Sequence, residues 1–151
     1  LLLPSPSWRL ADGGSQGMLA YGGDPADGKA KALRLRDRRS LLEWPAHILG
    51  LQDTPQGLVL ADPGGLWLIN VDGQPRALAF PRAARSMAWG EGAGLAVATE
   101  AGARLLPLDG GPTPFLSATG LRLRADGADL YVLLPAQGGV LRLRGLKALL
   151  P

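Results

Sequence analysis

A pattern of short apolar segments and glycine-rich turns recurs four times along this chain. The clearest copy spans residues 121–145 and reads LRLRADGADLYVLLPAQGGVLRLRG. Weaker copies occupy residues 17–37 (GMLAYGGDPADGKAKALRLRD), 57–72 (GLVLADPGGLWLINVD) and 94–109 (GLAVATEAGARLLPLD). The first apolar residues of the four copies are Met18, Leu58, Leu95 and Leu130, so the spacings are 40, 37 and 35 residues.

The fourth copy shows what each unit is expected to form. Its first segment, LRLRAD, alternates apolar and polar residues, which is typical of a β-strand with two different faces. Residues 130–134 are a continuous apolar run, which predicts a strand covered on both faces. Asp-Gly and Gly-Gly turns separate the strands. A further strand that ends near proline is expected after each unit, at residues 41–45, 77–81, 114–117 and 146–151.

A repeat of about 35–45 residues with several strands per unit is typical of propeller blades. We therefore predict an all-β, propeller-like array of four blade repeats of about 35–40 residues, which can be part of a larger ring. The repeats fall at approximately residues 7–45, 46–81, 85–118 and 120–151, and no linker divides them, so a single domain is expected. The side chains expected to be least exposed are Met18, Leu19, Leu58, Leu60, Leu95, Val97, Leu130 and Val132.

Composition limits the functions that remain open. Apolar residues make up 46% of the chain, which is ample for a core, and 22 glycines and 13 prolines favour turns over long helices. The chain has no cysteine, so disulfides and thiolate metal sites are excluded and the redox compartment stays open. A periplasmic or secreted location is slightly favoured over a cytoplasmic one. No apolar run approaches the roughly 20 residues of a membrane helix, so no transmembrane segment is expected.

The fourth unit resembles the propeller repeats of the YVTN and NHL type. The matching residues are Asp126, Gly127, Leu130, Tyr131, Val132, Gly139, Val140 and Leu143. Residues 65–68 (GLWL) are similar to the Gly-Leu-Trp segment of two-component-sensor propellers. This resemblance implies a propeller fold, which hosts many unrelated functions.

Arginine alternates with leucine in three LRLR segments, at residues 33–36, 121–124 and 141–144. Alternation on the third strands of the first and last units would place Arg34 with Arg36, and Arg142 with Arg144, on one face of each strand. Such a face could bind phosphate or another polyanion. The alternative is arginine packed by its stem and paired with turn aspartates such as Asp37 and Asp126. The candidate residues for a polyanion or a partner are Arg34, Arg36, Arg38, Arg39, Arg142 and Arg144.

Catalysis has less support in the sequence. His47 is the only histidine, so a metal site would need oxygen ligands. The available carboxylates are the turn residues Asp12, Asp24, Asp27, Asp53, Asp126 and Asp129. Lactonase-type propellers hold their metal with carboxylates and asparagines, whereas this chain has one asparagine, Asn70. No catalytic residue, metal or cofactor is therefore assigned.

The sequence favours a non-catalytic propeller-type domain that binds another protein, or a second copy of the chain, or scaffolds an assembly. A lactonase-like or hydrolase-like propeller enzyme with turn carboxylates is one alternative, and a binder of nucleic acid or another polyanion through the arginine-rich strands is the other. Residues 1–4 resemble one more outer strand, which gives five outer strands for four blades. We therefore expect no conventional single-chain ring, but part of a larger propeller or one completed by a second chain.

Overall fold

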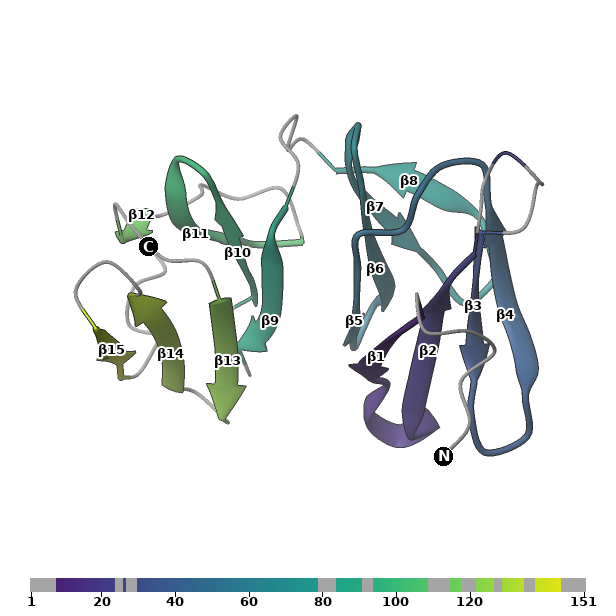
Figure 1. Ribbon diagram of the computed structural model, residues 1–151, viewed down its shortest axis with the longest axis horizontal. Helices are drawn as coiled ribbons and strands as arrows, with labels where there is room; N and C mark the ends of the chain where they lie inside the picture. Colours follow the sequence, from purple (N-terminus) through teal and green to yellow (C-terminus); the bar gives the residue numbers. More distant parts are fainter. Residues whose placement is uncertain are drawn as a thin grey trace. The chain divides into compact units, whose positions relative to one another are not determined.

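The computed structural model describes residues 8–23, 26, 30–78, 84–90, 94–108, 115–117, 122–126, 129–134 and 138–144. For Ser15, Arg122, Leu134 and residues 115–117 the description is confined to the backbone. These residues form four antiparallel β-sheets and one short 3-10 turn, η1 (Gly14–Gln16) (Figure 1). The chain divides into two compact units, Leu1–Pro81 and Arg82–Pro151, each with two sheets. The predicted all-β class is confirmed.

Each sheet of the first unit is a meander in which consecutive strands are neighbours. The first sheet contains β1 (Arg9–Asp12), β2 (Met18–Gly22), β3 (Ala30–Arg34) and β4 (Arg39–Trp44). The second contains β5 (Gly50–Thr54), β6 (Gly57–Asp62), β7 (Gly65–Ile69) and β8 (Pro75–Ala77). The expected outer strand near residues 41–45 is β4, whereas β8 ends at Ala77, where a strand was expected to begin.

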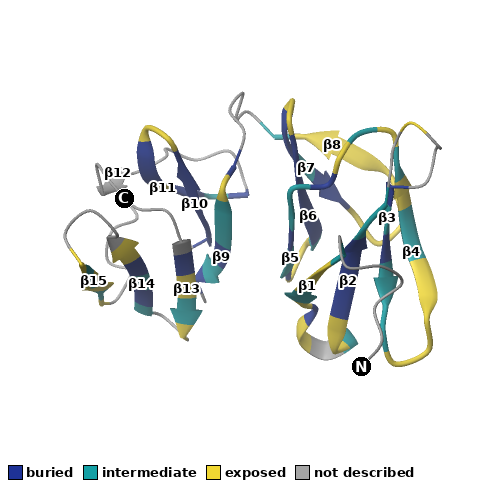
Figure 2. Cartoon of the chain, in the orientation of Figure 1, coloured by how far each residue is buried: buried dark blue, intermediate teal, exposed yellow. Residues whose placement is uncertain are grey.

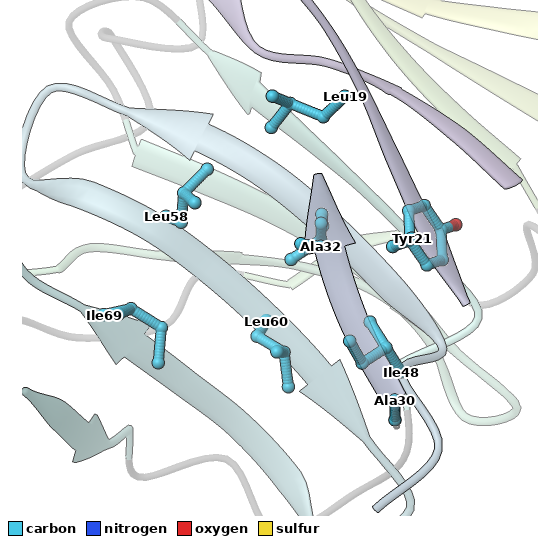
Figure 3. Close-up of a cluster of buried hydrophobic side chains, with 9 residues drawn as sticks. Leu19, Tyr21, Ala30, Ala32, Ile48, Leu58, Leu60 and Ile69 are labelled. Atoms are coloured by element: carbon cyan, nitrogen blue, oxygen red, sulfur yellow. The ribbon is translucent and has the colours of Figure 1, made fainter. Parts of the chain in front are cut away.

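The core of the first unit is a cluster of buried side chains contributed by both of its sheets (Figure 3). The alternation of side chains along a strand determines which residues belong to this cluster, because every second residue of β2, β3 and β6 faces it. Two tryptophans, Trp44 and Trp67, pack against its margin with ring centroids 5.4 Å apart in an edge-to-face arrangement. The buried members are Leu19, Tyr21, Ala30, Ala32, Ile48, Leu51, Leu58, Leu60 and Ile69.

The second unit repeats this organisation. One sheet contains β9 (Ser86–Gly90), β10 (Gly94–Thr99), β11 (Gly102–Leu106) and β12 (Phe115–Ser117). The other contains β13 (Arg122–Asp126), β14 (Asp129–Leu134) and β15 (Gly139–Leu143). Small residues of β9–β11 pack against larger ones of β13 and β14, and the buried members are Ala88, Ala96, Ala98, Ala103, Leu105, Leu123, Leu130 and Val132. Ser86 Oγ also accepts a hydrogen bond of 3.0 Å from the backbone N–H of Leu123.

The hairpin turns share a local chemistry that explains where strands end. Thr54 Oγ1 bonds the carbonyl of Gly57 at 2.7 Å, and Thr99 Oγ1 is 3.4 Å from the carbonyl of Gly102. In each turn the same hydroxyl accepts from the N–H two residues ahead, which closes the turn. The threonine side chain at the last position of each strand thus forms hydrogen bonds that a backbone group would otherwise form.

Two glycines with positive φ lie at corresponding points of the predicted second and third repeats. Gly57 (φ +135°) begins β6, and Gly94 (φ +139°) begins β10. A Cβ on Gly57 would lie 2.2 Å from the carbonyl oxygen of Ile69, and one on Gly94 would lie 3.1 Å from that of Leu106. The two glycines are 37 residues apart, as are the two carbonyls. The spacing found in the sequence therefore corresponds to a repeated backbone geometry.

The core prediction is confirmed for seven of its eight residues and is wrong for Met18. The seven are at most 7% exposed, whereas Met18 is 45% exposed. Leu19 and Tyr21 face the core, so Met18, one position earlier, points to the opposite face of β2. Figure 2 shows this change from exposed to buried at the start of β2.

Several expectations concern residues outside the described part. Residues 1–4, most of the loop at 22–29 and the outer strand at 146–151 lie there, so the predictions about a fifth outer strand and an incomplete ring stay predictions. Among the described residues, no helix is long and apolar enough to cross a membrane.

Candidate binding surfaces

Arg34 is paired with Asp37, an aspartate of the β3–β4 turn. It ends β3, its side chain is 15% exposed, and its guanidinium binds both carboxylate oxygens of Asp37 (Nε to Oδ1, 3.0 Å; Nη2 to Oδ2, 2.6 Å). The hydrogen bond from Arg34 is the main cause that lowers the pKa of Asp37 to about 2. Arg34 therefore follows the alternative interpretation, in which arginine pairs with a turn aspartate.

Three other candidate arginines lie in or beside the β3–β4 turn. Arg36 and Arg38 belong to the turn and Arg39 begins β4, and all three are exposed. Arg38 has φ +54°, a left-handed conformation that a tight turn requires. Because β3 ends at Arg34, the expected strand face shared by Arg34 and Arg36 is wrong, and this group is a basic turn.

The second arginine group lies on a sheet face that points away from the core of the second unit. Leu123, Leu130 and Val132 face the core, so the residues between them form the outer face of β13–β15. Its cross-strand rows follow from the register, in which Arg124 pairs with Tyr131 and Tyr131 pairs with Arg142. In the next row, Leu133 lies opposite Val140, and these side chains are 40% and 61% exposed.

Arg142 is held in place on this outer face. Its Nε donates to Oδ2 of Asp129 at 3.1 Å, and its guanidinium carbon lies 5.6 Å from the centre of the Tyr131 ring, within range of a cation–π contact. The hydrogen bond to Asp129 is the main cause that raises the pKa of Arg142. The interpretation in which a turn aspartate pairs with arginine is thus correct for Arg142, but the aspartate is Asp129 rather than Asp126. Arg144 follows β15 and is exposed.

Tyr131 was not among the binding candidates predicted from the sequence, and the predicted burial of β14 is wrong. The apolar run at residues 130–134 was expected to be covered on both faces, yet Leu133 is exposed and Tyr131 is only half-buried. No aromatic residue lies within the LRLR segments, but the register places Tyr131 between Arg124 and Arg142 on adjacent strands. The position of Tyr131 between two arginines follows from the order of the strands in the sheet and cannot be found within any one segment of the sequence.

The first sheet of the first unit carries two exposed apolar side chains on its outer face, although Ala20 in the same face is buried. Leu10, Ala20 and Leu33 form one cross-strand row on the face of β1–β4 that points away from the core. Met18 shares this face, and the ladder is extended by the backbone N–H of Leu35, which donates to the carbonyl of Met18 at 3.0 Å. Leu10 and Met18 are each 45% exposed. We call this surface the β1–β4 apolar face.

Among the turn carboxylates, Asp12 and Asp53 influence each other. Asp12 caps the turn after β1 by accepting from the N–H of Gly14 at 2.9 Å, and Asp53 lies on β5. Partial burial raises the pKa of Asp53, the negative charge of Asp12 raises it further, and a hydrogen bond from Gln16 opposes the shift. These two carboxylates alone do not make a metal site.

Among the described residues, the other candidate carboxylates and His47 add no third ligand to Asp12 and Asp53. Asp24 and Asp27 lie outside the described residues, and His47 is exposed. Asp126 and Asp129 flank the β13–β14 turn, where Asp129 binds Arg142. Within the described ranges, no three side chains of histidine, aspartate or glutamate are grouped so that they could hold a metal ion.

Comparison with known proteins gives this chain no family. No protein-family profile matches it, and no curated protein sequence matches it. The likeness to YVTN and NHL repeats stays a prediction.

Proposed function

We propose that this chain is a non-catalytic, propeller-like binding or scaffolding domain that associates with another protein chain. We take the partner to be a second copy, bound through the β1–β4 apolar face. The observation that carries the proposal is the exposure of two large apolar side chains, Leu10 and Met18, on neighbouring strands of one sheet face. Exposed apolar side chains that lie together on one face often mark an interaction site.

The propeller-like arrangement is supported by the repeated meanders. Each sheet is built from strands that follow one another in sequence, and three of the four sheets have four strands among the described residues. The similar contacts of Gly57 and Gly94, 37 residues apart, support a structural repeat. Blades of this type bury their faces by stacking on neighbouring sheets.

A second copy is supported by the polar margin of the same face. Lys31 lies on this face and pairs across strands with Glu43. A symmetric dimer brings the same patch of two chains together, so a patch with an apolar centre and both signs of charge is self-complementary. Lys31 of one copy would then meet Glu43 of the other.

Light scattering over a wide range of protein concentrations tests this proposal. The wild-type chain should rise from the monomer mass of 15.7 kDa to twice that value. The double variant Leu10→Ser, Met18→Ser should remain monomeric with an unchanged circular dichroism spectrum. Val71→Ser is the matched control, because Val71 is 94% exposed in the turn before β8 and lies outside this face.

Two results would contradict the proposal. A wild-type chain that is monomeric at every concentration excludes the second copy. An association that the double variant and the control weaken equally excludes the β1–β4 apolar face.

A further inference from the structure

We propose that the outer face of β13–β15 binds an extended acidic segment of another protein, in which carboxylates and aliphatic side chains alternate along one face of the segment, at every second residue. This inference goes beyond self-association and concerns a different surface, in the other unit of the chain. It is argued from the charge and the exposed apolar groups of this face.

The cross-strand rows of this face differ in their exposed side chains. The central row contains Arg124, Tyr131 and Arg142, one from each strand. In the adjacent row the register aligns Arg122, Leu133 and Val140, and the side chains of Leu133 and Val140 are exposed. An extended segment that lies along the strands presents every second side chain to this face, so residues two positions apart would meet the arginines of one row and the aliphatic pair of the other.

Some arginines of this face have a carboxylate partner among the described side chains and others do not. Asp129 binds Arg142, and the charge of Asp126 also acts on that guanidinium. Arg124 and Arg144 are exposed, and neither forms an ion pair with the described side chains. These two guanidiniums are suited to bidentate binding of carboxylates.

Two contacts orient Arg142 at the centre of this face. The ion pair with Asp129 and the contact with the Tyr131 ring fix Arg142 against the sheet. Tyrosine and arginine are the residues most often responsible for binding energy in protein interfaces, and less side-chain entropy is lost when they are already ordered.

The apolar pair favours a protein over a nucleic acid. Leu133 and Val140 lie directly opposite each other and are 40% and 61% exposed. Aliphatic side chains of a peptide can cover them, whereas a phosphate backbone cannot. A single-stranded nucleic acid would instead use the Tyr131 ring for stacking and the arginines for phosphate.

Fluorescence anisotropy with labelled peptides tests this inference. The probe is a short peptide that repeats Glu-Ser-Leu-Ser, so that glutamate and leucine alternate on one face of the extended chain; we call it the glutamate–leucine peptide. It is compared with peptides of equal length in which serine replaces leucine (glutamate–serine) or lysine replaces glutamate (lysine–leucine), and with single-stranded oligo-dT. The glutamate–leucine peptide should bind most tightly, and its affinity should fall as salt is added. Arg124→Gln and Val140→Ser should each weaken binding on the order of tenfold.

Matched controls separate this face from the rest of the chain. Arg76→Gln removes an exposed arginine of the first unit, and Val71→Ser removes an exposed aliphatic side chain; neither should change the affinity. The variant Leu10→Ser, Met18→Ser should bind the peptide normally, so failure of self-association and failure of this inference are distinguishable. Circular dichroism confirms that each variant is folded.

Four outcomes would overturn the inference. These are no binding of the glutamate–leucine peptide, equal binding of the lysine–leucine peptide, and equal binding of the glutamate–serine peptide, which would indicate charge alone. The fourth is tighter binding of oligo-dT that Tyr131→Leu abolishes and Tyr131→Phe preserves, which would indicate single-stranded nucleic acid.

Discussion

The indole Nε1 of Trp44 donates a hydrogen bond of 2.9 Å to Oδ2 of Asp62. Trp44 ends β4 and Asp62 ends β6, so this bond joins the two sheets of the first unit. The other carboxylate oxygen accepts from the backbone N–H groups of Gly64 (2.8 Å) and Gly65 (3.0 Å). Asp62 is only 6% exposed, and these three bonds offset the cost of burying its carboxylate.

Replacing Asp62 should therefore destabilise the first unit strongly. Asp62→Ala leaves the Trp44 N–H and two turn N–H groups without their partner, so we expect a loss of about 2–4 kcal/mol in the free energy of unfolding. Asp62→Asn keeps one carbonyl acceptor and should lose less. Urea denaturation followed by tryptophan fluorescence measures both. The control is Asp72→Ala in the exposed turn before β8, and an equal loss there would show that the bonds of Asp62 are unimportant.

The equivalent glycines should not tolerate alanine equally. In Gly57→Ala the new Cβ would lie 2.2 Å from the carbonyl oxygen of Ile69, whereas in Gly94→Ala the closest atom is 3.1 Å away. Both positions have positive φ, so we expect losses of about 1–3 kcal/mol, larger at Gly57. Gly138→Ala is the control, because its φ is +65° but its Cβ would meet no atom within 4 Å. Thermal melting ranks the three, and a smaller loss at Gly57 than at Gly138 contradicts the steric argument.

Core truncations should show that each unit depends on its middle strands. Leu60 in β6 and Leu130 in β14 are both fully buried, so Leu60→Ala and Leu130→Ala should each cost about 2–5 kcal/mol. Val71→Ala should change stability by less than about 0.5 kcal/mol, because Val71 is 94% exposed. Denaturation curves of the three variants measure these differences. A loss at either leucine as small as that at Val71 would contradict the assignment of the cores.

The sequence predicted the strands better than the faces they present. Turn chemistry and apolar runs placed β2, β6, β10 and β14, because these signals are local in the chain. The orientation of Met18 was wrong, since a run that begins with two apolar residues does not say which of them faces the core. The surroundings of Tyr131 could not be read from its own segment either, because they come from β13 and β15. Cross-strand register is a tertiary property, and it decides what the candidate surface contains.

The arginine candidates illustrate the same limit. The LRLR pattern predicted strand positions for Arg34 and Arg142 correctly. The alternative interpretation, pairing with turn aspartates, gave the right partner for Arg34, which is Asp37, whereas Arg142 pairs with Asp129 rather than Asp126. It did not reveal that the chain turns after Arg34, which removes Arg36 from the strand. Leucine and arginine can continue to alternate in the sequence through a turn, but residues in the turn no longer share a face of the strand.

The last prediction concerns the stability of the first unit as a function of pH. The folded-state pKa of Asp53 is raised above its ordinary value of 3.8, mainly by burial and then by the charge of Asp12. As pH falls, the folded state therefore takes up this proton before the unfolded state does. Ionised Asp53 opposes folding above the raised pKa, and this effect disappears below pH 3.8.

Asp53→Asn should therefore be more stable than the wild type at neutral pH, and its advantage should shrink to nothing as pH falls through the window between the raised pKa and 3.8. Asp72→Asn, in an exposed turn, is the matched control and should show no such window. Asp12→Asn should narrow the window by lowering the pKa of Asp53, because it removes the neighbouring negative charge. Urea denaturation of the four proteins at several pH values measures the differences. An advantage of Asp53→Asn that is constant, or that grows as pH falls, would show that Asp53 is not held in an unfavourable ionised state.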